Sequence, residues 1–114
     1  MANSFKSKTD TAIGTSAATL YTCPSSTQST IIGLTVANIA SSQIIIDVQL
    51  DASGRTAGAQ DSVYIIKDAP IPVGSSLVVV GGEQKVVMEP GDTLKITSDT
   101  ASSADAIASL LEIT

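Results

Sequence analysis

Residues 31–50 read IIGLTVANIASSQIIIDVQL, and this stretch decides the fold class. Apolar residues alternate with small or polar ones over 32–37 and again over 44–50. A period of two is typical of a β-strand with one face in a core. The segment Ala40-Ser41-Ser42 is short enough for a hairpin, so we expect these strands to pair antiparallel. The expected inward residues are Ile32, Leu34 and Val36, then Ile44, Ile46, Val48 and Leu50.

Similar signals continue on both sides of this stretch. The pair Gly81-Gly82 predicts a tight turn and a second hairpin, and Pro90 and Gly91 occupy the positions that a type II turn requires. In the strand after that turn, Leu94 and Ile96 are expected to point inward. The further expected strands cover residues 4–8, 18–23, 62–67, 77–80, 83–88 and 93–97.

Residues 104–113 fit two structures. Ile107, Leu110 and Leu111 have helical spacing, so an amphipathic helix is one alternative. As a strand, the segment places Ile107, Leu111 and Ile113 on one face with Ser109 among them. We favour the strand, because the preceding elements are all β and a closing strand would pair with an open sheet edge.

These eight or nine short strands predict an all-β fold, an antiparallel β-sandwich that is jelly-roll-like. The length of 114 residues fits one core. We therefore expect a single sandwich domain over residues 16–114. The polar residues 1–15 are expected to form an N-terminal arm without a core of its own.

The composition argues against most catalytic chemistry. Charged residues make up 15% of the chain, whereas 16 Ser and 13 Thr supply much of its polarity. There is no His or Trp, and Cys23 is the single cysteine. This excludes Ser-His-Asp and Cys-His catalysis, histidine metal sites and cysteine-cluster zinc sites. We expect a non-enzymatic protein without cofactor or metal; the weak alternative is calcium bound by Asp99 and Asp105.

Charge and hydropathy limit the partners. The net charge is −5, and the six Lys and Arg residues are scattered, which argues against nucleic acid. No apolar run approaches the ~20 residues of a membrane span, and the polar start does not look like a signal peptide. We expect a protein made in a host cytoplasm. Cys23 is expected to be a packed, inert thiol rather than a reactive one.

Six short motifs stand out along the chain: LYTCP at 20–24, IIGLTVAN at 31–38, APIPVG at 69–74, VVGG at 79–82, PGD at 90–92 and LEI at 111–113. Together they resemble small virion structural proteins of tailed bacteriophages, of the kind found in marine cyanophage-like viruses. The resemblance covers about residues 18–114. It implies a non-enzymatic β-sandwich in the virion, repeated many times and bound to other virion proteins or to copies of itself.

Within the virion we expect a capsid decoration or cement protein, with a neck, tail or fibre accessory protein as the alternative. The arm would be held by a neighbouring subunit or the shell, unless it packs only on its own domain. The alternative of another class is a carbohydrate-binding module of a receptor-binding fibre, with Tyr64 as an aromatic platform. The expected interface residues are Phe5, Lys6 and Lys8 in the arm, Arg55 in the exposed loop 52–61, and Tyr64.

Overall fold

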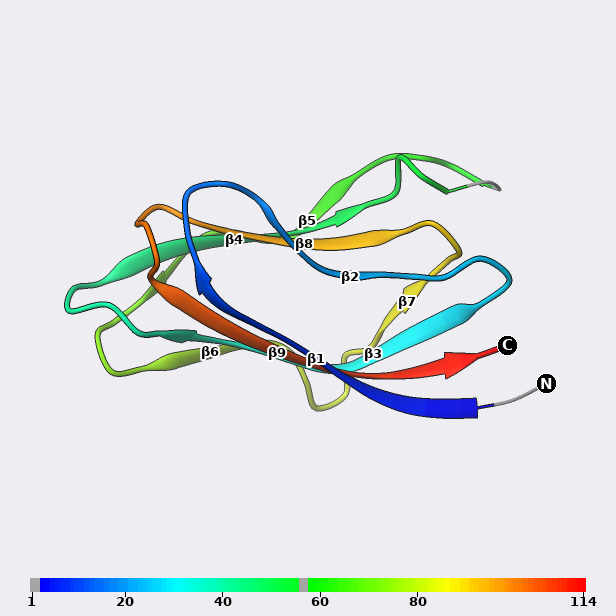
Figure 1. Cartoon of the computed structure of the whole chain (residues 1–114), viewed down its shortest axis with the longest axis horizontal. Coiled ribbons are helices and arrows are strands. Elements are labelled where there is room, and N and C mark those ends of the chain that lie inside the picture. The colour runs from blue at the N-terminus through cyan, green and yellow to red at the C-terminus, as the bar shows by residue number, and fades with distance from the viewer. Residues whose placement is uncertain (1–2, 56–57) are drawn as a thin grey trace.

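The computed structural model describes residues 3–55 and 58–114, which contain nine β-strands and no helix (Figure 1). Among these residues no helix could span a membrane. The predicted strand over 104–113 is confirmed, and the helix alternative is wrong. The strands are β1 (Asn3–Ile13), β2 (Ala18–Thr22), β3 (Gln28–Asn38), β4 (Ile44–Asp51), β5 (Val63–Ile71), β6 (Ser76–Val80), β7 (Val86–Met88), β8 (Thr93–Ser98) and β9 (Ala104–Ile113).

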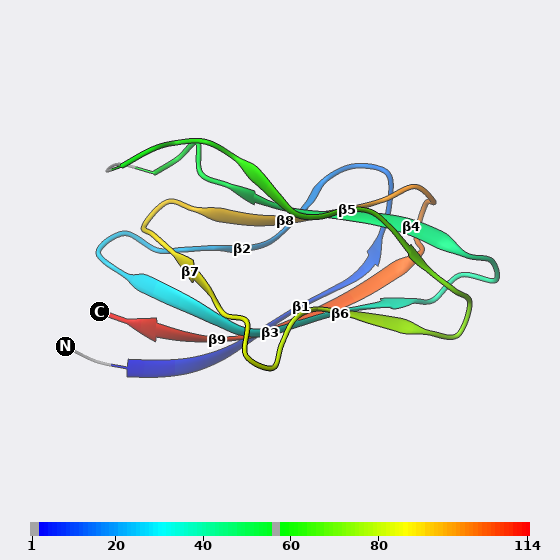
Figure 2. The ribbon, with the colours of Figure 1, turned by 180° about the vertical axis from the view of Figure 1, so that it is seen from behind.

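The strands form two antiparallel sheets that face each other, which confirms the β-sandwich (Figures 1 and 2). Sheet A has the order β1-β9-β3-β6, with β7 also paired to β3, and sheet B has the order β2-β8-β4-β5. Most connections pass from one sheet to the other, because strands that follow each other in sequence lie in different sheets. This order is compatible with the expected jelly-roll-like arrangement, which stays a prediction.

Two expected hairpins are wrong for this reason. Strand β3 lies in sheet A and β4 in sheet B, so the connection through Ala40-Ser41-Ser42 crosses the sandwich instead of joining paired strands. Strands β6 and β7 both pair with β3 and not with each other. Residues 81–85 therefore interrupt one edge of sheet A.

The core lies between the sheets, and the alternation predicted most of its members correctly. In β3, however, the register with β9 shifts between Ile31 and Gly33. This bulge places Ile31 in the core, fully buried, whereas Ile32 is only partly buried. Leu50 is also only partly buried. The largest fully buried side chains include Ile31, Leu34, Val36, Ile44, Ile46, Val48, Ile71, Val80, Met88, Leu94, Ile96 and Leu110.

Strand β1 contains most of the expected arm. It pairs with β9 of its own chain, from Asn3 opposite Ile113 to Ile13 opposite Ala104. Figure 1 shows β1 alongside β9. The order of this segment needs no neighbouring subunit, so the argument that the arm must be held by another protein fails.

Candidate functional site

The outer face of sheet A carries an apolar surface made by strands that are distant in sequence. Residues directly opposite each other in antiparallel strands point to the same side of the sheet, so the strand register shows which side chains meet. Outward side chains from β1, β9, β3 and the β6/β7 edge form rows across the sheet. We call this surface the outer face.

Two of these rows combine large apolar side chains with threonines. Phe5, Val78, Val87 and Ile107 are 79%, 64%, 57% and 47% exposed. Exposed apolar side chains gathered on one surface are typical of contact sites. One row is Phe5, Leu111, Thr30 and Val87, and the other is Thr9, Ile107, Thr35 and Val78.

The row between them is small and uncharged. It consists of Ser7, Ser109 and Gly33. A flat strip of small residues lets another backbone approach closely, and hydroxyls cost far less to desolvate than charges. None of the side chains in these three rows is ionisable.

A hollow lies at one end of the outer face. Its volume is ≈ 470 Å³, and its lining includes Thr9, Ile107, Ala37 and the carboxylate of Asp105. That carboxylate accepts hydrogen bonds from the Thr11 hydroxyl at 2.6 Å and the Ala12 N–H at 3.1 Å. The acid is therefore satisfied by its own chain, and the hollow is bordered mainly by threonine and apolar groups.

The outer side of sheet B has a different character, because several ion pairs lie there. Lys95 binds Asp51 at 2.8 Å, and Lys67 lies 3.6 Å from Asp47. The hydrogen bond from Lys95 and those from Ser53 and Ser62 lower the pKa of Asp51 below its usual range. Such side chains are solvated and costly to cover, so the two broad faces of the molecule differ in how readily they can pack against a partner.

The structure separates the five expected interface residues. Phe5 lies on the outer face, as the two rows show. Lys6 and Lys8 point to the opposite side of β1, towards the sandwich interior. Lys6 lies 3.4 Å from Glu112, and Lys8 lies 5.9 Å from the centre of the Tyr21 ring.

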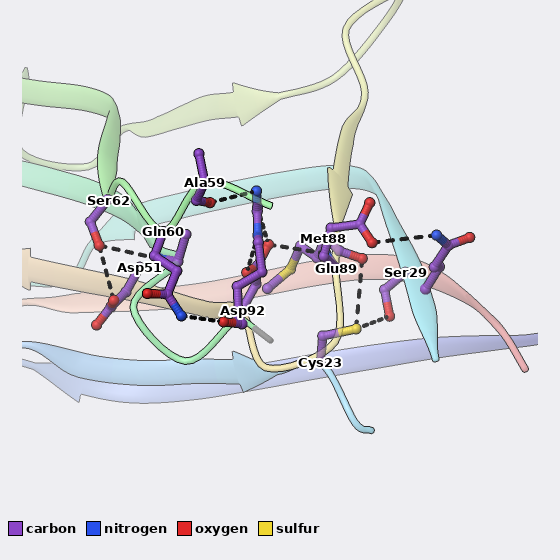
Figure 3. A network of polar contacts seen from close by, with 12 residues as sticks. Cys23, Ser29, Asp51, Ala59, Gln60, Ser62, Met88, Glu89 and Asp92 are labelled. Carbon is purple, nitrogen blue, oxygen red and sulfur yellow. Dashed lines mark hydrogen bonds and ion pairs between the residues drawn. The ribbon is translucent and has the colours of Figure 1, made fainter. Parts of the chain in front are cut away.

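Arg55 is engaged within its own chain. Its guanidinium donates from Nε and Nη2 to the two oxygens of Asp92, at 3.0 and 2.6 Å, and also donates to the Ala59 carbonyl. Asp92 is completely buried and accepts the Glu89 N–H as well. Through these hydrogen bonds Arg55 holds its loop against the turn before β8; Figure 3 labels its partners Asp92 and Ala59. The hydrogen bonds with Asp92 raise the pKa of Arg55.

Tyr64 is half exposed on edge strand β5, opposite Gln49 of sheet B. The Lys67 ammonium lies 4.7 Å from the centre of its ring. One aromatic ring beside a lysine offers only a small contact surface for a sugar. Tyr64 lies in sheet B, whereas Phe5 lies in sheet A. Phe5 and Tyr64 therefore do not form one site.

A buried polar cluster lies inside the end of the sandwich. The Tyr21 hydroxyl donates to Glu112 at 2.5 Å and lies 2.6 Å from the Ser29 hydroxyl. The Tyr21 hydrogen bond, aided by Lys6, lowers the pKa of Glu112, while burial and the same hydrogen bond raise the pKa of Tyr21. Every buried polar side-chain atom of this cluster has a hydrogen-bond partner within the chain. We therefore interpret the cluster as part of the core.

Cys23 belongs to the same region and is 1% exposed. Its Sγ donates to the Thr27 carbonyl at 3.2 Å and lies 3.4 Å from the Ser29 hydroxyl (Figure 3). Burial raises the pKa of this thiol, which keeps it protonated. The burial agrees with the packed thiol that we expected.

The weak calcium alternative gains no support from the geometry. The Asp99 carboxylate accepts the Ile45 N–H and the Thr100 hydroxyl, whereas Asp105 is bound to Thr11 and Ala12. The two acids thus accept hydrogen bonds from different segments of the chain. Within the described ranges, no cluster of three or more metal-ligating side chains is found.

The sequence did not lead us to Val78, Val87 and Ile107 as surface residues. Each of the three has an apolar residue on both sides in the sequence. The pattern alone therefore does not show which side chains of the strand point towards the other sheet. The spacing of Ile107, Ser109, Leu111 and Ile113 on one face was predicted, and that face is the outward one.

The chain matches no protein-family model and no curated protein. Among solved structures it is similar to a chain described as "Bacillus endospore appendages form a novel family of disulfide-linked pili". The TM-score is 0.56, with 16% sequence identity over 99% of this chain and 87% of that chain. At this identity the similarity establishes a shared β-sandwich fold and nothing about function.

Proposed function

We propose that this protein is a non-enzymatic structural subunit of a phage virion, which binds other virion proteins through the outer face of sheet A. Within the particle we propose a capsid decoration or cement protein, and a neck, tail or fibre accessory protein as the alternative. The virion assignment rests on the sequence motifs described above.

The observation that carries the packing role is the three uncharged rows of the outer face. Its exposed apolar side chains, Phe5, Val78, Val87 and Ile107, come from four strands and meet in rows with threonine between them. Covering such a surface removes apolar area from water without stripping a charge of its hydration.

The similar pilus chain lends general support, because it shows a sandwich of this kind in a protein described as forming pili. The linkage named for that family is disulfide. Here the one cysteine, Cys23, is buried, so this chain offers no surface thiol for such a link. Non-covalent packing through the outer face is therefore the mode that we propose.

Two lysine substitutions test the proposal. Val87→Lys and Ile107→Lys place a charge in each apolar row while leaving the core untouched. We expect each variant to fold normally but to be lost from purified particles, with occupancy reduced about tenfold or more. Ile45→Lys is the matched control, since Ile45 is also a partly exposed isoleucine but lies on sheet B. Normal incorporation of both outer-face variants would overturn the role of this face.

Copy number separates the two positions in the virion. On the order of hundreds of copies per particle would identify a decoration protein, and about six or twelve would identify a collar or tail ring, following closed rotational symmetry. Density for the protein in a reconstruction of the virion would give the same answer. A chain that never copurifies with particles would contradict the virion assignment itself.

The carbohydrate-binding alternative makes a different prediction. Tyr64 is the exposed aromatic ring on sheet B, so a fibre module would bind glycans there and lose binding in Tyr64→Ala. Glycan-array binding that depends on Tyr64, together with normal incorporation of the lysine variants, would favour this alternative.

A further inference from the structure

Strand β1 is attached to the sandwich almost entirely through its backbone. None of the side chains in residues 3–10 is buried, and the first buried side chain in the strand is Ile13. The polar side-chain contacts of residues 3–10 with the rest of the domain include the Lys6 pair with Glu112 and the approach of Lys8 to the Tyr21 ring. Detaching these residues therefore uncovers little apolar surface of β1 itself.

If β1 detaches, the edge of β9 that it covers is left with unpaired backbone groups, and another strand must pair with them. Residues 104–113 read ADAIASLLEI, a long apolar strand with only two acids. A bare edge of this composition pairs with any available strand and promotes aggregation. The occupant must also carry a cation where Lys6 meets Glu112, because Glu112 is 7% exposed. A strand of the β1 sequence meets both requirements, whichever copy of the chain supplies it.

The end of this segment has the geometry of a hinge. The register between β1 and β9 shifts between Asp10 and Ile13, and Ala12 has a φ of 54°. Left-handed backbone is unfavourable for alanine, so the chain holds local strain at this point.

The residues beyond the hinge are firmly anchored. Ile13 is buried, and its carbonyl accepts the Ser103 N–H at 3.0 Å. The Gly14 carbonyl accepts the Ser98 N–H at 2.9 Å. Residues 3–10 can therefore swing away while the rest of the domain stays folded.

We propose that β1 is an exchangeable strand, which in the assembled protein pairs with β9 of a second copy in the register it has within one chain. Exchange keeps the pairing of residues 3–10 with β9 and relaxes Ala12. The balance then depends on hinge strain and on the local concentration of subunits, which is high in a lattice. The inference extends the proposed function by naming the partner, yet it is tested on purified protein alone.

Two single-cysteine chains give the test, both carrying Cys23→Ser. Ser7 and Ser109 are opposite each other and exposed on the outer face. A mixture of the Ser7→Cys chain and the Ser109→Cys chain forms a disulfide between chains in this register only if β1 of one lies on β9 of the other. We expect this product on non-reducing gels, increasing with protein concentration. In the control mixture, Thr19→Cys replaces Ser109→Cys. Thr19 is exposed on strand β2 of sheet B, so the disulfide formed with it measures random collisions between chains.

A matched pair of hinge variants sharpens the test. Ala12→Gly accommodates the positive φ and should lower the yield of the linked product about tenfold, because glycine removes the strain. Ala12→Pro excludes that φ and removes the N–H that binds Asp105, so it should raise the yield by a similar factor. Cooperative unfolding checks that each variant folds. If Ala12→Pro does not fold, the decrease with Ala12→Gly decides.

The inference is overturned if the linked product never exceeds the Thr19 control, or if its yield does not follow the hinge. That result would leave the proposed function intact, because the lysine variants test the outer face separately. Linked product in solution together with normal particle incorporation of Val87→Lys and Ile107→Lys would leave the exchange in place and remove the proposed role of the outer face.

Discussion

Glu112 is an acid placed in the core of the sandwich, where Tyr21 donates to it and Lys6 lies near. Its lowered pKa stabilises the fold at pH values above the usual 4.5 of a glutamate, and this contribution is lost as the pH falls through the lowered value. We therefore expect the free energy of unfolding to decrease as the pH falls from neutral through the lowered pKa of Glu112. Urea unfolding at a series of pH values measures this decrease.

Other acids with lowered pKa values, such as Asp51 and Asp99, also reduce stability at low pH. The substitution Tyr21→Phe isolates the contribution of the Tyr21–Glu112 pair. The substitution leaves buried Glu112 without its hydroxyl donor, so we expect a loss of about 1–2 kcal/mol at pH 7. The loss should shrink at a pH low enough to protonate Glu112. A loss that is the same at both pH values would contradict the assignment.

Arg55 was expected at an interface, and its contacts instead predict a structural role. Arg55→Ala leaves the buried Asp92 carboxylate without its bidentate partner, so the thermal midpoint should fall by about 5–10 °C. Arg55→Lys keeps the charge but cannot make both hydrogen bonds to Asp92 in the same geometry, so its thermal midpoint should fall by less. Scanning calorimetry compares the two. Equal midpoints for Arg55→Ala and the unmodified protein would show that Asp92 does not need this partner.

Among the elements, the turn before β8 has the strictest packing requirement. Gly91 has a φ of 91°, and a Cβ there would lie 2.2 Å from the Gly54 carbonyl oxygen. The turn hydrogen bond from the Asp92 N–H to the Glu89 carbonyl is present at 3.0 Å, as the type II prediction requires. The loop and this turn thus lie against each other at Gly54 and Gly91. The hydrogen bonds from Arg55 to Asp92 hold them together.

Gly91→Ala should therefore destabilise the protein by more than about 3 kcal/mol, since strain and a backbone clash add. Gly74→Ala is the control, because Gly74 also has a positive φ, of 76°, but nothing lies within 4 Å of its Cβ position. That variant should lose only about 1–2 kcal/mol. Denaturant unfolding of both proteins gives the comparison, and equal losses would mean that the close approach to Gly54 does not matter.

The elements also show what alternation can and cannot predict. Buried Ile44, Ile46 and Val48 follow from a period of two, which depends only on the neighbouring residues of one strand. The partner of a strand depends on residues far away, so β3 and β4 look like a hairpin and lie in different sheets. The bulge at Ile32 has no local signal either, because it arises in the register with β9.

The candidate site was predicted only in part for the same reason. Phe5 is exposed because it points away from the other sheet, and its polar neighbours in the sequence indicate an exposed strand. Val78 and Val87 lie in apolar runs, where only the position of the other sheet shows which residues face water. The rows of the outer face are a property of the sheet order, which no single segment contains.

At the scale of the whole molecule, charge is distributed unequally between the two broad faces. If the outer face of sheet A makes the contacts, binding to particles should change by less than about twofold between low and high salt, because no charges in its rows are available for screening. Sheet B, with its lysine and aspartate pairs, would give strong salt dependence. Cosedimentation with particles lacking the protein measures this, and binding that weakens steeply in salt would exclude the outer face.

Strand β9 lies between β1 and β3 in sheet A, although it is made after both of them. While residues 104–113 are still inside the ribosome, the centre of that sheet is missing, and two strands wait without their main partner. The sandwich can therefore close only after these residues have emerged. Until then the nascent chain exposes its unpaired strands, and the two lysines of β1 together with the hydroxyl side chains of β1 and β3 help to keep these strands from pairing wrongly.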